Sequence, residues 1–179
     1  DYCNKHNIYL IEDCSQAHGS SMHDLHVGSF GHIAVWSTMF SKTISTGSCG
    51  GVIGTNDSDL FSLIKSHADR GKSFDDPDFN PRDMHLYMFP SLNLSQSEIP
   101  CAIGLASLSK IERTINKRIL IAMWVREFLS LYKSSASIYI PSPGSRVSYF
   151  FLILSYPNHF FPLYKKDFIQ LAADLNLPV

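Results

Sequence analysis

The sequence begins with short apolar segments that end in polar residues, and this pattern constrains the fold more than any other feature. IYLIE (residues 8–12) is a β-branched run typical of a buried parallel strand, with Asp13 at its C-terminal end. HIAVWST (32–38) and GGVIGT (50–55) predict two further strands. NDSDLFSLIKSHADRG (56–71) predicts a helix that an aspartate or serine caps at its start and a glycine ends. Strands followed by a helix in this order favour an α/β fold.

The second half of the chain predicts long helices and then a smaller unit. Residues 72–93 form an aromatic, proline-containing loop whose composition indicates an ordered structure, and residues 97–133 keep apolar residues at helical spacing. The segment 137–148 contains Pro and Gly and is the best candidate for a linker or boundary. YFFLILSY and KKDFIQLAADLNL then predict a strand and an amphipathic helix. We therefore expect one domain over residues 1–136 and the start of a smaller α/β domain over 137–179.

Charge and hydropathy exclude several classes of partner. Fifteen Lys and Arg against 16 Asp and Glu give a formal charge of -1, so no basic field attracts nucleic acid or an anionic membrane. Apolar runs such as ILIAMWV are too short to span a bilayer, and the N-terminus lacks a signal-peptide pattern. We expect a cytoplasmic protein without nucleic-acid or membrane partners. Because the chain opens without Met and stops directly after a predicted helix, we also expect a segment of a longer protein.

No metal site is expected. The cysteines are widely spaced and form no CxxC pair, so reduced thiols are the default: Cys3, Cys14, Cys49 and Cys101. Three histidines of the first polar loop match no tight ligand spacing: His23, His26 and His32.

The carboxyl ends of the first two strands carry a group of side chains suited to one kind of cofactor. If these strands are parallel neighbours, one crevice receives Asp13, Gln16, His18, Ser37 and Lys42. A pyridine-aldehyde cofactor needs an amine to form a Schiff base, a carboxylate to face the pyridinium nitrogen, and a hydroxyl with nearby N–H groups for its phosphate. The residues alone leave other readings open: a solvated loop lysine, a turn aspartate, and ordinary polar positions for the amide and the hydroxyl. His18 is interpreted as a structural residue or a neighbour of the site.

Three stretches of the sequence resemble the DegT/DnrJ/EryC1/StrS family of sugar aminotransferases. They are IEDCSQAHGS, VGSFGHIAVWSTMFSKTISTGSCGGVIGTND and PSLNLSQSEIPCAIGLASLSKIERTINKR. The likeness extends more weakly through YFFLILSY and KKDFIQLAADLNLPV, so it covers essentially the whole chain in order. It implies a fold-type I enzyme that depends on pyridoxal phosphate. This chain would hold part of the large mixed or parallel-sheet domain and the start of the small C-terminal domain.

The resemblance also implies roles for individual residues. Lys42 matches the lysine that forms the Schiff base and then moves a proton between cofactor and substrate carbons. Asp13 matches the carboxylate at the pyridinium nitrogen, and Gln16 matches the amide near the ring and its 3-hydroxyl. Ser37 matches a hydroxyl that contacts the phosphate. Asn93 matches an asparagine that reaches the phosphate in the partner subunit's site, which implies a homodimer with shared active sites.

The chain departs from the family pattern around Asn93 and at its ends. Ser91 and Leu92 replace a Gly-Tyr pair, and Ser95 stands where the family has a basic residue on the phosphate, a loss that Arg82 would have to offset. The family's N-terminal portion, with its phosphate-cradling loop and ring-stacking aromatic, is absent from this sequence. A related branch, the 3-dehydratases of deoxysugar pathways, carries histidine in place of the Schiff-base lysine, so Lys42 favours transamination.

Two functions follow as expectations. The first is amino transfer to a keto-sugar carried on a nucleotide, with glutamate as the amino donor, in the biosynthesis of amino sugars or polysaccharide. The second is a non-catalytic fragment or degenerate paralogue that keeps the sheet and Lys42 without binding cofactor productively. Ser95 and the missing terminal portions favour the second.

Overall fold

The computed structural model describes residues 2–132, 135–155 and 165–175. These residues belong to two compact units. The first comprises Asp1–Arg118 and Pro141–Phe150, and the second comprises Ile119–Ile140 and Phe151–Val179. The chain therefore enters the second unit, returns to the first, and enters the second again. The division into domains at residues 136 and 137 stays a prediction.

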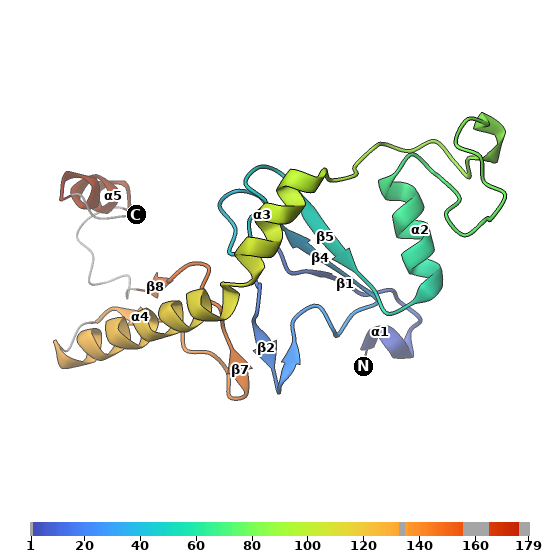
Figure 1. Cartoon of the computed structure of the whole chain (residues 1–179). Coiled ribbons are helices and arrows are strands. Elements are labelled where there is room, and N and C mark those ends of the chain that lie inside the picture. The colour runs from blue at the N-terminus through green and yellow to red at the C-terminus, as the bar shows by residue number, and fades with distance from the viewer. Residues whose placement is uncertain (1, 133–134, 156–164, 176–179) are drawn as a thin grey trace. The chain divides into compact units, whose positions relative to one another are not determined.

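The first unit is built on a mixed sheet of the three strands that the sequence predicts. It consists of β1 (Ile11–Asp13), β4 (Ile33–Ser37) and β5 (Gly51–Gly54), in the order β1-β4-β5 (Figure 1). β1 and β4 are parallel, with Asp13 opposite Val35, and β5 runs antiparallel to β4. The parallel pair confirms that the carboxyl ends of β1 and β4 meet at one edge of the sheet.

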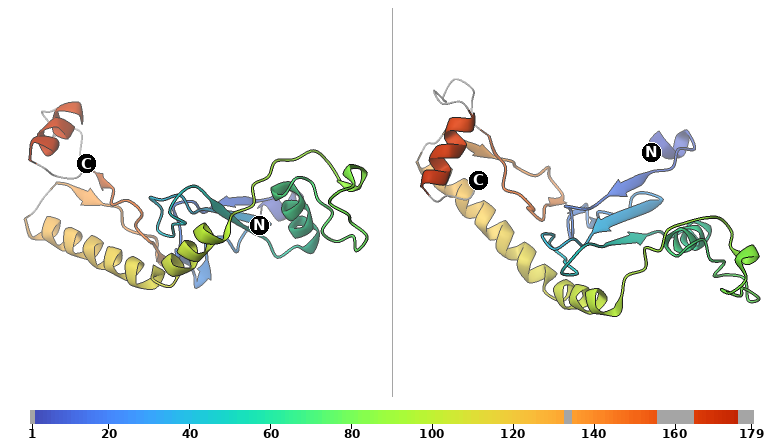
Figure 2. Two further views of the ribbon diagram at one scale, coloured as in Figure 1. Left: turned by 45° about the horizontal axis from the view of Figure 1, so that its top comes forward. Right: turned by 90° about the horizontal axis from the view of Figure 1, so that it is seen from above.

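Helix α2 (Ser58–Ala68) follows the sheet and has the ends that its sequence predicts. The side chain of Asp57 accepts hydrogen bonds from the backbone N–H groups of residues 59 and 60, and Gly71 has a φ of +77° just beyond the helix. The loop 72–93, which contains a short 3-10 helix η1 (Met84–Leu86), lies on the far side of α2 from the sheet (Figures 1 and 2). A single turn of helix, α1 (Tyr2–Lys5), precedes β1.

The long helical pattern at 97–133 forms two helices. They are α3 (Glu98–Leu108) and α4 (Ile111–Leu131), and the chain breaks between them at Ser109 and Lys110. A pattern of apolar residues does not reveal this break because the spacing continues across it. Within the first unit, α3 packs on the loop after β4, where the Ser107 hydroxyl accepts a hydrogen bond from the N–H of Ser45 at 3.1 Å.

The segment predicted as a linker, 137–148, is tied into both units. Its first residues form β6 (Ser137–Ile138), and its later residues form β7 (Ser145–Arg146). In the first unit β7 pairs with β2 (Ser21–Met22), which also pairs with β3 (Leu25–His26). Pairing of β7 with β2, more than 100 residues away, satisfies the backbone of the later part of this segment. The chain also passes from one unit to the other inside the segment, between Ile140 and Pro141. Its interpretation as a linker or boundary between domains stays a prediction.

The second unit contains the rest of α4, β6, β8 (Leu154–Ser155) and α5 (Lys165–Asp174). β6 and β8 pair antiparallel, with Ile138 opposite Leu154. Small apolar residues dominate its buried positions: Ala122, Ala136, Ile138 and Ala172. The predicted strand YFFLILSY is confirmed only at β8, and residues 156–164 lie outside the described part of the chain. Among the described residues, no helix is long and apolar enough to cross a membrane.

Candidate active site

Lys42 lies in a closed loop that begins where β4 ends. The carbonyl of Thr38 accepts hydrogen bonds from both the N–H and the hydroxyl of Thr46, each at 2.9 Å, so the two threonines close the loop between them. Inside it, the N–H of Lys42 donates to the carbonyl of Met39 at 2.9 Å. The turn therefore presents a half-buried lysine at the carboxyl end of the central strand.

Asp13 ends the neighbouring strand and is a stable carboxylate. Its Oδ1 accepts a hydrogen bond from the N–H of Ser15 at 3.0 Å. Hydrogen bonds from the side chain and backbone of Ser15 are the main cause that lowers the pKa of Asp13; burial opposes them, and the positive charge of Lys42 is the weakest of the lowering effects. The carboxyl group is therefore ionised and lies within electrostatic reach of the lysine.

His18 lies against the same loop but is buried in an apolar setting. Its side chain is 2% exposed, and neither ring nitrogen has a hydrogen-bond partner among the described residues. Burial is the main cause that lowers the pKa of His18; the Ser37 backbone acts in the opposite sense, and the charges of Lys42 and Arg118 add to the lowering. The imidazole borders a cavity of about 660 Å³ that Trp36 also lines. These observations support the structural role expected for His18, because a neutral, buried ring is a poor acid.

The remaining predicted residues divide between this region and a separate one. Ser37 is the last residue of β4, and its Oγ lies 3.4 Å from the N–H of Met39. Gln16 is exposed in the turn after β1. Asn93 is exposed elsewhere in the first unit, where it bridges to Asp69 at the end of α2. The structure thus brings Asp13, Ser37 and Lys42 to one edge of the sheet and places Asn93 beside α2.

Sequence reasoning missed Glu12, which organises the strand that carries Asp13. Its carboxylate accepts three backbone hydrogen bonds, from Gly28 at 2.8 Å, Phe30 at 2.7 Å and Gly31 at 2.6 Å. Gly28 has a φ of +100°, and a Cβ there would overlap the ring of Trp36. A charged residue inside an apolar strand next to a Gly-rich turn was the available signal, because buried carboxylates are rare unless they are paired.

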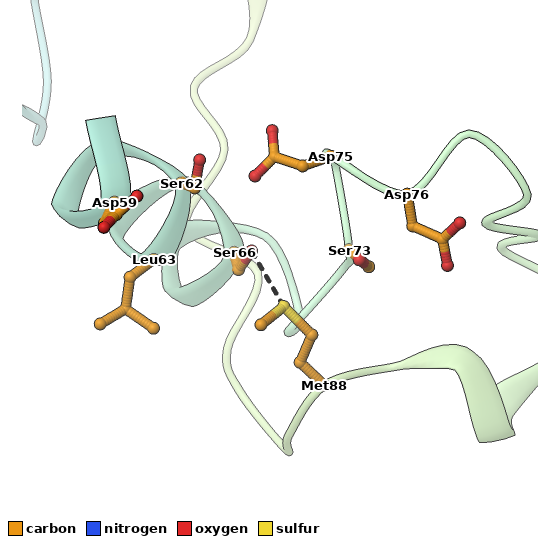
Figure 3. A pocket seen from close by; sticks show the side chains of 8 residues that line it. All are labelled: Asp59, Ser62, Leu63, Ser66, Ser73, Asp75, Asp76 and Met88. Carbon is orange, nitrogen blue, oxygen red and sulfur yellow. Dashed lines mark hydrogen bonds between the residues drawn. The ribbon is translucent and has the colours of Figure 1, made fainter.

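A second hollow lies between α2 and the loop 72–93 and has a different character. It measures about 570 Å³ and is lined by three serines, two apolar side chains (Leu63 and Met88) and three aspartates: Asp59, Asp75 and Asp76. Figure 3 shows the hydroxyl of Ser66 donating to the sulfur of Met88, at 3.6 Å. No group of His, Cys, Asp or Glu suited to a metal ion occurs among the residues that the structure describes.

The edge formed by Asp13, Ser37 and Lys42 fits the chemical groups of pyridoxal phosphate. An ionised carboxylate is what a protonated pyridine nitrogen requires, and Asp13 is exposed to receive one. Lys42 offers the primary amine, and among the described residues it makes no ion pair that would occupy it. Ser37 adds a hydroxyl at the end of β4. The donor set therefore fits the cofactor that the sequence predicts.

Comparison with known proteins gives the family of this chain. The sequence matches the DegT/DnrJ/EryC1/StrS aminotransferase family over residues 1–174. It is 32% identical over 129 residues to the GDP-perosamine synthase of Escherichia coli O157:H7, which covers 72% of this chain and 31% of that protein. It is 29% identical over 148 residues to the L-glutamine:2-deoxy-scyllo-inosose aminotransferase of Micromonospora echinospora, covering 81% of this chain and 35% of that protein.

A solved structure extends the comparison to the fold. The aminotransferase from Psychrobacter cryohalolentis superposes with a TM-score of 0.86 at 28% identity, over 98% of this chain and 48% of that one. The chain therefore spans about a third of the length of the curated relatives and about half of the solved one. By sequence and by fold, the chain belongs to the DegT/DnrJ/EryC1/StrS aminotransferase family, whose members are pyridoxal-phosphate-dependent enzymes of fold type I.

Proposed function

We propose that the protein containing this chain transfers an amino group to a keto-sugar, and that this chain supplies the reactive lysine. The observation that carries the proposal is Lys42 at the carboxyl end of a parallel strand pair, beside the ionised Asp13. A solvated loop lysine would not need the closed threonine loop around it.

Each residue at the sheet edge has a distinct task in this proposal. Pyridoxal phosphate, when bound, supplies an electron sink for the carbon that exchanges its amino group. The Asp13 carboxylate would hold a proton on the pyridine nitrogen. Lys42 Nζ would provide the amine that holds the cofactor and would also serve as the acid and base that moves the proton between carbons. The Ser37 hydroxyl would donate to the phosphate, and the Gln16 amide would contact the ring.

The substrates are proposed from the relatives. GDP-perosamine synthase is named for a nucleotide-linked amino sugar, which supports a keto-sugar on a nucleotide as the acceptor and a place in amino-sugar or polysaccharide biosynthesis. Glutamate remains our proposed donor. The name of the Micromonospora relative gives L-glutamine as the donor for that enzyme, so glutamine is the second candidate.

A homodimer with shared sites belongs to the same proposal. Asn93 is exposed and lies beside α2, and its carboxamide oxygen accepts only a long bond from the N–H of Ser95, at 3.3 Å, among its contacts in the described residues. This placement supports a role for Asn93 at the phosphate of a partner subunit. A cytoplasmic location is proposed with it, in keeping with the free thiols of all four cysteines.

The test is an absorbance titration of the full-length protein with pyridoxal phosphate, followed by addition of glutamate or glutamine. We expect a visible band that Lys42→Ala abolishes and that the correct donor discharges. Lys65→Ala is the matched control, because Lys65 also lies over a phenylalanine ring, that of Phe74, at 4.3 Å. A band that survives in Lys42→Ala, or no band in the unchanged protein, would favour the non-catalytic paralogue.

A further inference from the structure

The amine of Lys42 lies over the ring of Phe150. Its Nζ is 5.0 Å from the ring centroid, within the range of a cation–π contact. The guanidinium carbon of Arg118 is 5.9 Å from the same centroid. Phe150 is 108 positions away in sequence, at the last residue of the segment that returns to the first unit. Its place beside Lys42 is therefore a property of the tertiary structure.

Phe150 is held in place by the strand that precedes it. Ser148 is 1% exposed, and its N–H donates to the hydroxyl of Ser20 at 3.1 Å. Arg146 donates to the carbonyl of Gly19 at 3.1 Å and forms a salt bridge with Glu112. These bonds fix the segment to the loop after β1, so the ring is not free to follow the lysine.

The Lys42 side of the contact is held as well. Arg118 donates to the hydroxyl of Thr43 at 2.8 Å, directly after Lys42 in the chain. The backbone of Lys42 is fixed by its turn, so only the side chain can move between the Phe150 ring and other groups nearby.

Two neighbours compete for that side chain. Asp13 ends β1, the parallel neighbour of the strand that leads into the Lys42 turn, yet the two side chains form no ion pair in the described part of the chain. An ion pair would occupy both groups, since the carboxylate must face a pyridine nitrogen and the amine must reach the aldehyde on the opposite side of the ring. A cation–π contact between two half-buried side chains is at least as strong as an ion pair to an exposed carboxylate, so one aromatic ring is sufficient to decide the competition.

We propose that Phe150 is a positioning residue that holds the Lys42 amine apart from Asp13 until the cofactor binds. The role of Lys42 in this proposal rests on the proposed function, but the geometry does not. Removing the ring while keeping an apolar side chain releases the amine to the carboxylate.

The direct test is a carbodiimide reaction on the full-length protein after its cofactor has been removed. Carbodiimide joins a carboxylate to an amine only where the two are in contact, and mass spectrometry quantifies the Asp13–Lys42 amide. We expect Phe150→Leu to raise its yield about twofold to fivefold or more, the range that begins with loss of a weak cation–π contact. Phe150→Tyr keeps the aromatic face and should match the unchanged protein. Phe150→Met repeats the test if Phe150→Leu does not fold.

The matched control is Phe74→Leu, which removes the cation–π contacts of Lys65 and Lys72 and leaves Lys42 untouched. Its yield should equal that of the unchanged protein. An unchanged yield in Phe150→Leu, or an equal rise in Phe150→Tyr, overturns the proposal.

Cofactor affinity gives a second readout. Phe150→Leu should weaken binding of pyridoxal phosphate about twofold to fivefold, and should have no effect in an Asp13→Asn background, where no carboxylate competes for the amine. An equal loss in both backgrounds would indicate a purely structural role and overturn the proposal. If the unchanged protein forms no Lys42-dependent band, the proposed function fails, while the cross-linking result still decides the role of Phe150.

Discussion

Glu12→Gln tests how the strand that carries Asp13 is held. The Glu12 carboxylate uses Oε1 for the N–H groups of Phe30 and Gly31 and Oε2 for that of Gly28. A glutamine has one acceptor oxygen, so its NH₂ must face at least one of these donors. The substitution keeps the shape of the side chain and changes only its hydrogen-bonding capacity.

The expected magnitude follows from these three bonds. Losing one bond to a charged acceptor costs about 1.5–3 kcal/mol, and the other two weaken when the acceptor becomes neutral. Together these effects give about 2–4 kcal/mol for the local stability of the 28–31 turn. Because 1.4 kcal/mol is a factor of ten, amide exchange through local opening should accelerate about 30-fold to 700-fold.

Hydrogen–deuterium exchange with mass spectrometry measures this directly on the peptide that contains residues 28–31. Glu127→Gln is the control, because Glu127 is an exposed carboxylate on α4. Equal protection of the peptide in Glu12→Gln and the unchanged protein would show that the three bonds do not hold the turn, and the reasoning would be wrong.

Three further predictions concern other contacts of the first unit. The pKa of His18 in the folded state lies below its usual 6.5, so the unfolded chain takes up the proton first as the pH falls, and stability is lost below about pH 6.5. Thermal melts at pH 7.5 and pH 5 should therefore show a smaller pH-dependent loss of stability in His18→Leu than in the unchanged protein. Gly71→Ala should cost more than about 2 kcal/mol in urea unfolding, since φ is +77° and a Cβ would overlap the carbonyl oxygen of Phe89. Arg118→Met and Thr43→Val should each weaken binding of pyridoxal phosphate about threefold to tenfold, because both remove the hydrogen bond that holds the residue after Lys42. The double variant should be no weaker than Arg118→Met, which also removes the contact with Phe150; additive losses in the cofactor titration would contradict this.

The sequence predicts the sheet edge well because its signals are local. Three apolar runs specify β1, β4 and β5, and Asp57 caps α2 as its position suggests. Once β1 and β4 are parallel, the polar residues after them share an edge, so Asp13 and Lys42 are brought together as predicted. The strands are shorter than the apolar runs, because pairing with a neighbour ends before the run does.

The sequence does not predict what surrounds these residues, because those contacts are between distant segments. The Gly- and Pro-rich stretch at 137–148 has the composition of a linker, yet β7 pairs with β2, and Ser148 bonds to Ser20. Arg118 lies in a helical pattern that gives no reason to associate it with Thr43, 75 positions away. Contacts of this kind form between segments that are far apart in sequence, and the local periodicity of the sequence does not predict them.

Phe150 also makes its contact with Lys42 across a long stretch of sequence. Lys42 lies near one exposed carboxylate and one aromatic face, and each attracts an ammonium group only weakly. When two weak attractions are nearly equal, a small change in either one redistributes the side chain between them. In the proposed site the carboxylate is needed to face the cofactor ring, so its removal is not a way to free the amine. The aromatic face is the attraction that a substitution can change without altering the carboxylate. The segment that carries Phe150 is kept in position by its hydrogen bonds to Ser20 and Gly19.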